Sequence, residues 1–298
     1  MSLFDDLVDT ALRRKEGLAP LRVVVEKELL HHDILRVLSS AGLLAQLTFI
    51  GGTCLRACYG SSRLSEDLDF TGGADFTRDQ LAAMSKILVE NLHAKYGLDV
   101  SVTDPVREEG NVDTWKLKVQ TRPGKKDLPS QRINIDVCAI PSYDARPMAL
   151  LNPYGVEMGT SGLILKAQSR EEIFADKLIA FALRPNKLKN RDLWDIAWLH
   201  QQQIKPALDL IEKKLADHHA EANAYLKAFG ARAASLKHDP EIASAFRKEM
   251  SRFLPNTIVN ETVNSADFWD YLSDLMHDYH RRLTQILTGK TPQPEFKM

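Results

Sequence analysis

Two aspartates that are separated by one residue are the clearest chemical signal in the chain. Asp67 and Asp69 alternate with the apolar residues Leu68 and Phe70. This alternation predicts a β-strand with one buried face, so both carboxylates share the other face, roughly 6.5 to 7 Å apart along the strand. Two carboxylates at that spacing can bind Mg²⁺, which prefers hard oxygen ligands and keeps waters that substrate phosphates later replace.

A pair of glycines lies shortly upstream of these acids. Residues 47–50 are apolar and predict a short buried strand, after which Gly51 and Gly52 let the backbone turn closely. We expect Thr53 to open a helix that runs to about Tyr59. The first amides of a helix lack internal partners and face the positive end of its dipole, so they can hold phosphate. A lone glycine pair or a lone aspartate pair is usually an ordinary turn, but together they predict a metal-nucleotide site.

A third acid lies on a predicted hairpin. Residues 114–120 and 132–138 both alternate apolar and polar side chains, and the long connection between them contains Pro and Gly. Asp136 falls on the polar face with Asn134. An acid in the middle of a strand is costly unless it is paired, metal-bound or exposed. Asp136 is therefore a candidate third metal ligand, and equally an ordinary aspartate on an exposed face.

The second half of the chain carries a lysine of interest. Ser169 and Glu172 have the spacing of a capping box, which predicts a helix that stops before Pro185. Lys177 and Arg184 share one stripe of that helix and can donate to a triphosphate or to a nucleic-acid backbone. The alternative is a surface lysine whose stem lies on apolar neighbours.

Two aspartates occupy the helix that follows. Asp192 and Asp195 are three residues apart and share a face. One of them is a candidate to orient Lys177 or the attacking hydroxyl, and the sequence leaves open which one is essential. Asp192 is equally well explained as a helix-start acid that the helix dipole favours.

Two basic groups are candidate RNA contacts, although basic loops often serve only solubility. The first lies between the two helices of the second half and contains Arg184, Lys187, Lys189 and Arg191. The second, a weaker signal because Asp127 dilutes it, surrounds the hairpin tip and contains Arg122, Lys125, Lys126 and Arg132.

These motifs resemble a known family. The resemblance begins with the first-half residues Gly51, Gly52, Thr53, Arg63, Ser65, Asp67 and Asp69. They look like the signature of the AbiEii/AbiGii-type nucleotidyltransferase toxins, which are relatives of DNA polymerase beta in fold. The helix with Lys177 and the helix with Asp192 and Asp195 are similar to later motifs of that family. The resemblance covers roughly residues 47–199.

The expected architecture is an α+β fold. The resemblance implies a polymerase-beta-like nucleotidyltransferase lobe at residues 1–162 and a mainly helical C-terminal lobe at residues 163–298, with the active site between them. Residues 141–162 are rich in Pro, Gly and Ser and predict the boundary. The pattern also predicts helices at residues 3–15, 20–41 and 77–96, a strand at 98–103, and helices at intervals after residue 169.

The resemblance also implies an activity. It predicts transfer of a nucleoside monophosphate from an NTP to RNA, at the tRNA 3′ end, by an abortive-infection toxin that blocks translation and is controlled by a cognate antitoxin protein. Asp67, Asp69 and Asp136 would bind Mg²⁺ or Mn²⁺, and Asp136 is alternatively the base that deprotonates the hydroxyl. Gly51, Gly52, Thr53 and Arg63 would hold phosphates. Lys177 would balance developing charge with support from Asp195 or Asp192.

Two other functions remain open. The same fold can modify a small molecule, as antibiotic-type nucleotidyltransferases do. A catalytically inert relative that binds a nucleotide or a partner is the second alternative. A metal-dependent nuclease would use similar acids but would not need the glycine phosphate seat.

Whole-chain properties set limits on these functions. The 298 residues include 39 Lys and Arg against 40 Asp and Glu, so RNA binding has to come from local patches. Three cysteines fit reduced thiols. The pairs His31–His32 and His218–His219 predict surface or cap positions. The sequence has no apolar run that could cross a membrane, so we expect a cytoplasmic protein.

Overall fold

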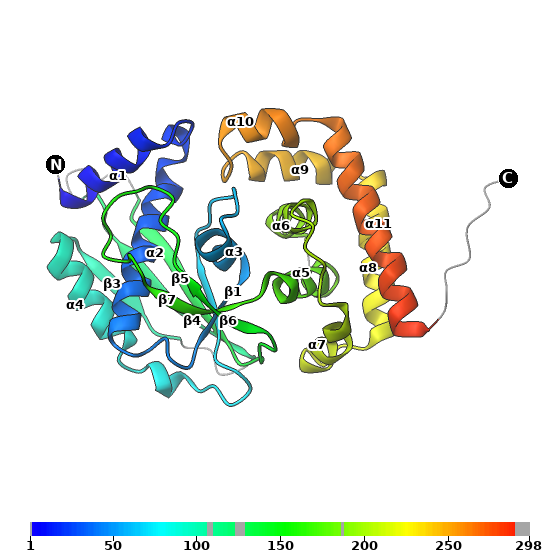
Figure 1. Ribbon diagram of the computed structural model, residues 1–298, viewed down its shortest axis with the longest axis horizontal. Helices are drawn as coiled ribbons and strands as arrows, with labels where there is room; N and C mark the ends of the chain where they lie inside the picture. Colours follow the sequence, from blue (N-terminus) through cyan, green and yellow to red (C-terminus); the bar gives the residue numbers. More distant parts are fainter. Residues whose placement is uncertain (1, 106–109, 123–128, 186–187, 290–298) are drawn as a thin grey trace. The chain divides into compact units, whose positions relative to one another are not determined.

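The computed structural model describes residues 2–105, 110–122, 129–185 and 188–289 (Figure 1). The chain forms two compact units. The first contains Met1–Ser169 and Phe253–Pro255, and the second contains Arg170–Arg252 and Asn256–Met298.

A mixed sheet forms the centre of the first unit. Its described strands are β1 (Thr48–Ile50), β2 (Leu68–Thr71), β3 (Val100–Thr103), β4 (Val112–Val119), β5 (Gln131–Cys138), β6 (Ala145–Ala149) and β7 (Ile164–Gln168). They form a seven-stranded sheet in the order β3-β4-β5-β2-β1-β7-β6 (Figure 1). β2 is antiparallel to β1 and parallel to β5. The predicted α+β class is confirmed.

Alternation of side chains gives this sheet an apolar face and a polar face. Leu68 and Phe70 of β2 and Ile135 of β5 are buried, as are Trp115 and Leu117 of β4. The helices of this unit are α1 (Leu3–Arg14), α2 (Arg22–Ser40), α3 (Gly51–Tyr59) and α4 (Met84–Tyr96). Helix α2 contacts both α4 and β5, so it packs on the apolar face. The opposite face, which carries the intervening polar residues, is called the open face below.

The edge of the sheet differs from the expectation. Residues 141–162 predicted a connection, but Ala145–Ala149 forms β6, which is antiparallel to β7. Strand β7 in turn pairs with β1 in parallel, so it belongs to the first unit, which extends to Ser169 rather than to residue 162. Strand β6 contains Pro147, which lacks a backbone donor and is tolerated at a sheet edge. The proline and its charged neighbour Arg146 hide the strand pattern.

The start of the third predicted helix is also different. Thr77 and Gln80 form the predicted capping box, but it opens a 3₁₀ turn, Arg78–Leu81. Helix α4 begins only at Met84.

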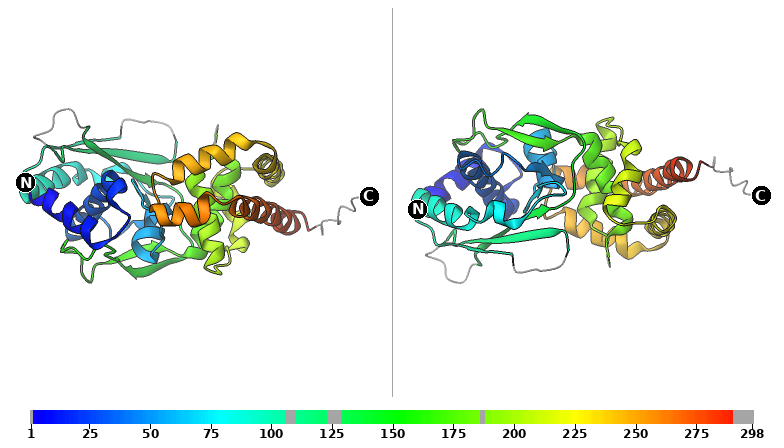
Figure 2. Two further views of the ribbon diagram at one scale, coloured as in Figure 1. Left: turned by 90° about the horizontal axis from the view of Figure 1, so that it is seen from above. Right: turned by 90° about the horizontal axis from the view of Figure 1, so that it is seen from below.

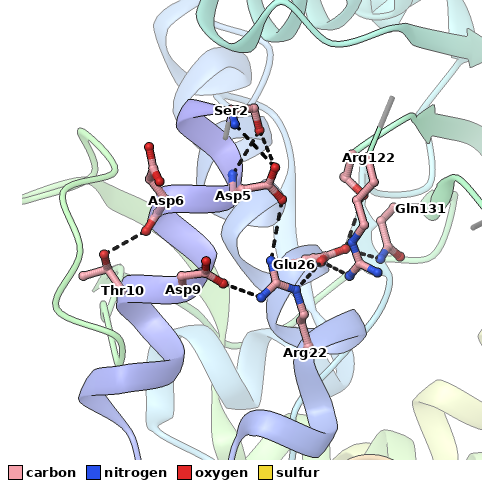
Figure 3. A network of polar contacts seen from close by, with 10 residues as sticks. Ser2, Asp5, Asp6, Asp9, Thr10, Arg22, Glu26, Arg122 and Gln131 are labelled. Carbon is pink, nitrogen blue, oxygen red and sulfur yellow. Dashed lines mark hydrogen bonds and ion pairs between the residues drawn. The ribbon is translucent and has the colours of Figure 1, made fainter. Parts of the chain in front are cut away.

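A buried acid of α2 connects this helix to the hairpin of β4 and β5, and its partner Arg22 connects it to α1 (Figure 3). Glu26 of α2 is 1% exposed and accepts hydrogen bonds from Arg22, Arg122 and Gln131. Arg22 also forms an ion pair with Asp9 of α1. Arg122, one of the candidate RNA contacts near the hairpin tip, is therefore engaged within the fold.

The second unit is helical in its described residues. Its α-helices are α5 (Arg170–Leu183), α6 (Asn190–Gln201), α7 (Ile211–Asp217), α8 (Ala222–His238), α9 (Pro240–Met250), α10 (Asn256–Ile258) and α11 (Ala266–Thr288). Helix α11 packs along α8 (Figure 2). A Cβ atom at Gly230 of α8 would lie 2.7 Å from the His280 ring of α11, so a glycine is needed at this close approach. None of the helices in the described parts of the chain is long and apolar enough to span a membrane.

Candidate active site

Two predicted carboxylates are neighbours on the open face. Asp69 of β2 and Asp136 of β5 are register partners on parallel strands, and both are half-buried. Adjacent strands lie about 4.8 Å apart, so the two side chains leave the sheet side by side. The neighbouring residues Leu68 and Ile135 point into the core. The predicted orientation of Asp69 and Asp136 toward the polar face is confirmed.

Asp67 adds a third acid from a loop, and we call Asp67, Asp69 and Asp136 the carboxylate row. The prediction that Asp67 lies on the strand is wrong, because residues 60–67 have no regular secondary structure and β2 begins at Leu68. One carboxylate oxygen of Asp67 accepts a hydrogen bond of 3.0 Å from the backbone N–H of Asn134 in β5. Asp67 is therefore tied to the same strand that carries Asp136. We call residues 60–67 the Asp67 loop.

Gly51 packs directly against this row. It has a φ of 76°, a left-handed conformation that favours glycine. A Cβ atom at Gly51 would lie 2.7 Å from Oδ2 of Asp69, so any side chain would displace the carboxylate. Helix α3 begins at Gly51 rather than at Thr53 as predicted, so the glycine pair forms the first turn of the helix. No side chain caps this end of α3.

Thr53 serves the fold with its hydroxyl group. The side chain is buried, and its Oγ1 lies 2.6 Å from Oγ of Ser65 and donates to the carbonyl of Asp67. The predicted phosphate contact of Thr53 is therefore left to its backbone amide. Arg63 is likewise buried and donates to the carbonyl of Leu64, so we assign it no phosphate contact.

Helix α2 also holds the Asp67 loop, a role that the sequence did not reveal. Glu28 is 4% exposed and accepts a hydrogen bond of 2.8 Å from the backbone N–H of Ser65. Lys27 forms an ion pair of 2.8 Å with Glu66. Nε2 of His31 lies 3.0 Å from the carbonyl of Glu66. Helix α2 thus contacts both residues that precede Asp67.

Glu28 also joins the loop to α3. Its carboxylate accepts hydrogen bonds from the guanidinium of Arg56 in α3, at 3.1 and 3.2 Å, and from the hydroxyl of Tyr154. Burial and the charge of Glu28 raise the pKa of Tyr154, so its hydroxyl keeps the proton that it donates. The contacts of one carboxylate therefore fix α2, α3 and the Asp67 loop together.

The predicted surface positions of His31 and His32 are wrong. Both rings are buried, and Nδ1 of His32 lies 3.0 Å from Oγ1 of Thr160. Burial lowers the pKa of each histidine to about 4, so both are neutral at pH 7. The adjacent polar residues predicted exposure. Helix α2 has neighbours on several sides, however, and both histidine rings are buried against them. The exposed pair His218 and His219 agrees with its prediction.

The acids of the site fit a hard cation in type but are not gathered around one point. Asp67, Asp69 and Asp136 provide the oxygen donors that Mg²⁺ prefers. Among the described residues, no three His, Cys, Asp or Glu side chains lie close enough together to hold a metal ion. Gly51 leaves space beside Asp69 that a Cβ atom would fill. The chain therefore supplies carboxylate oxygens as ligands and space for a cation beside Asp69. The carboxylates would have to turn toward the cation to bind it.

The second unit gathers the other predicted residues. Lys177 of α5 is 9% exposed, and its ammonium group forms ion pairs with both Asp192 and Asp195 of α6. Arg184 donates a hydrogen bond of 2.9 Å to Asp192. Burial raises the pKa of Asp192, but Lys177 and Arg184 outweigh it and hold the pKa below its ordinary value. Both aspartates thus contact Lys177 within this unit, and their role in orienting it for the reaction stays a prediction.

The basic loop of the second unit is largely engaged. Arg191 forms an ion pair of 3.4 Å with Glu249, and Arg184 bonds to Asp192. The charge of Lys189 also acts on Asp192. Lys187 lies outside the described residues. The predicted RNA contact of this loop stays a prediction.

The three cysteines are reduced, and Cys54 and Cys58 are buried. Cys54, Cys58 and Cys138 are free thiols, as predicted. Burial and the neighbouring Cys58 raise the pKa of Cys54, so it remains protonated.

Adjacent carboxylates beside an uncapped helix N-terminus can bind a cation and a polyphosphate together, which is the chemistry of a nucleotidyltransferase. The chain belongs to the family described as "Nucleotidyl transferase AbiEii toxin, Type IV TA system", which matches residues 33–274. It is therefore a nucleotidyltransferase of a type IV toxin–antitoxin family, and the predicted resemblance is confirmed.

The solved structures that are similar to this chain include two proteins of low sequence identity. MenT4, a nucleotidyltransferase toxin from Mycobacterium tuberculosis, is 20% identical, with 76% of this chain and 70% of that chain covered and a TM-score of 0.48. JHP933 from Helicobacter pylori is 16% identical, with 88% of this chain and 97% of that chain covered and a TM-score of 0.47. No curated protein matches the sequence.

The contact between Gly51 and Asp69 yields a first prediction. Gly51→Ala should abolish most of the activity, because the methyl group displaces the Asp69 carboxylate. It should also lower the free energy of unfolding by about 1 to 2 kcal/mol through the left-handed backbone. Gly42→Ala is a matched control, because Gly42 has a φ of 73° and nothing lies within 4 Å of its Cβ position. Equal activity losses in the two variants, at equal stability, would contradict this account.

The ion pairs of Lys177 yield a second prediction. Lys177→Met leaves Asp192 and Asp195 buried without their shared cation, which should cost about 3 to 5 kcal/mol in chemical denaturation. Adding Asp192→Asn and Asp195→Asn removes the two buried carboxylate charges that Lys177 balanced and should restore most of the stability. The triple variant should stay inactive if Lys177 acts in the reaction. Recovery of activity along with stability would reduce Lys177 to a structural role.

Proposed function

We propose that this enzyme transfers a nucleoside monophosphate from an NTP to the 3′ hydroxyl of RNA, at the acceptor end of tRNA, and thereby blocks translation. The observation that carries the proposal is the register pairing of Asp69 with Asp136 beside Gly51. The family supplies the toxin–antitoxin context and implies an antitoxin partner. The RNA acceptor is the part that the experiment below tests.

The first turn of α3 is suited to hold the β and γ phosphates of the NTP. The backbone amides of Gly51, Gly52 and Thr53 start the helix, and no side chain caps them. Amides at a helix N-terminus donate to anions, and the dipole favours negative charge there. Because Gly51 has no side chain, these amides lie close to the Asp69 carboxylate.

The three carboxylates would bind the cation and assist the transfer step. Asp67, Asp69 and Asp136 would hold Mg²⁺ or Mn²⁺, which when bound supplies charge neutralisation for the phosphates. The oxygen of the RNA hydroxyl bonds to the α-phosphorus, the bond from that phosphorus to the bridging oxygen breaks, and pyrophosphate leaves with the bonding electrons. Asp136 would either complete this set of metal ligands or accept the proton that leaves the hydroxyl.

We assign the second-unit cluster to the same reaction. Lys177 would balance charge that develops on the phosphates, and Asp195 and Asp192 would fix the position of its ammonium group. Both ion pairs hold Lys177 in one place, which lowers the cost of ordering a long side chain during the reaction.

Labelling by the purified protein tests this function. The protein is incubated with each of the four α-labelled NTPs, Mg²⁺ and total RNA, and the labelled end is mapped. We expect label at the 3′ end of tRNA. Asp69→Asn should reduce the rate by at least roughly a hundredfold, because an amide binds the cation that neutralises the phosphates more weakly than a carboxylate does.

Asp113→Asn is the matched control. Asp113 lies on β4 next to the site, but it forms an ion pair with Arg78 and its register partner is Val137, which faces the core. Its amide variant should retain activity. A parallel reaction contains small antibiotic-type acceptors in place of RNA, and label on these with none on RNA would contradict the RNA acceptor. Equal labelling by Asp69→Asn and wild type would contradict the site.

A further inference from the structure

Three exposed cations lie on the open face next to the carboxylate row. Lys116 and Lys118 belong to β4 and Arg132 to β5, and all three are exposed. Their neighbours along the strands, among them Leu117 and Ile133, are buried. Strand alternation therefore points the cations to the side of the sheet that carries Asp69 and Asp136. We call Lys116, Lys118 and Arg132 the basic strip.

The basic strip contains an unfavourable pair. Lys118 and Arg132 are register partners on antiparallel strands, so two like charges stand directly opposite each other. Like charges in this arrangement destabilise a sheet. Neither residue forms an ion pair with any residue that the structure describes, whereas other cations of this unit, such as Lys27 and Arg122, do. The fold thus places two cations together where no described anion offsets their repulsion.

The strip is spaced regularly from the reacting groups. Lys116 pairs with Asn134, which is two residues from Asp136, and Lys118 pairs with Arg132, two residues further along β5. Each two-residue step is about 6.6 Å. The strip therefore extends over the second and third positions of a line that begins at the carboxylate row.

We propose that the basic strip binds the phosphodiester backbone of the acceptor RNA and directs its 3′ end to Asp69 and Asp136. This inference rests on the proposed function. A chain of phosphates with repeated negative charges fits a line of cations, and the near-neutral protein needs such a local patch to attract RNA. On the neighbouring strand β3, Ser101 and Thr103 pair with Lys118 and Lys116. Both residues are exposed, and their hydroxyl groups can donate to phosphate.

Charge reversal at one residue tests the proposal, because it should increase stability and weaken RNA binding at the same time. Arg132→Glu places an anion opposite Lys118, so the unfolding midpoint should rise. The same change repels phosphate, so the KM for RNA should rise by roughly tenfold while the KM for NTP stays the same. A merely structural role for Arg132 would not raise stability and weaken RNA use together. An unchanged KM for RNA would overturn the proposal.

The salt dependence of binding gives an independent test that needs no catalysis. The probe is a fluorescent RNA hairpin with a single-stranded 3′ end. Replacement of all three strip residues by Gln should reduce the slope of log K against log salt by about 2, because each phosphate that a cation neutralises on a single strand contributes about 0.7 to the slope. The control replaces three exposed cations of the same unit by Gln, namely Arg13, Lys15 and Lys86. The control should keep the wild-type slope.

The outcomes separate this proposal from the function on which it rests. If wild-type protein labels RNA but the strip variant shows the wild-type slope and KM, the strip proposal fails and the proposed function stands. If wild-type protein labels no RNA, the proposed function fails, and the strip fails with it if the slope is unchanged. A strip variant that uses RNA normally but resists its antitoxin would assign the strip to a protein partner and overturn RNA binding.

Discussion

The interaction on which the site depends is the buried hydrogen bonding of Glu28. Its carboxylate accepts hydrogen bonds from the backbone N–H of Ser65, the guanidinium of Arg56 and the hydroxyl of Tyr154. The Asp67 loop has no secondary structure of its own, so its backbone has to be held from outside. Helix α2 supplies those contacts through Glu28, and α3 supplies others through Thr53. The carboxylate row is therefore ordered by residues that do not belong to it.

This arrangement has a physical cost that indicates its purpose. A buried carboxylate loses its hydration, and an ion pair in the interior often stabilises a protein no more than apolar residues of similar size. Hydrogen bonds are directional, however, and apolar packing is not. Glu28 therefore fixes the position of the loop, although its burial costs free energy. Such fixed positions are needed in a site whose geometry tolerates little variation. Gly51 contributes in the same sense, because it accepts a left-handed backbone that brings α3 onto Asp69.

The sequence predicted what local pattern encodes and missed what depends on distant partners. Alternation placed Asp69 and Asp136 on the polar face, because a strand with one buried face has a period of two. Their pairing in register joins strands far apart in the chain, and no local pattern encodes it. The surface assignment of His31 failed for the same reason, since burial of α2 depends on neighbours from distant segments. Strand β6 was missed because an edge position tolerates Pro147.

Amide hydrogen exchange across residues 60–69 tests the central claim most directly. Glu28→Gln replaces one carboxylate oxygen by an amide donor that faces Arg56 or Tyr154, and Glu26→Gln makes the same change on the same helix at an acid that contacts Arg22, Arg122 and Gln131 instead. We predict that exchange in this segment accelerates at least tenfold in the Glu28 variant and stays near wild type in the Glu26 variant. Equal exchange in the two variants would show that α2 does not hold the loop through Glu28.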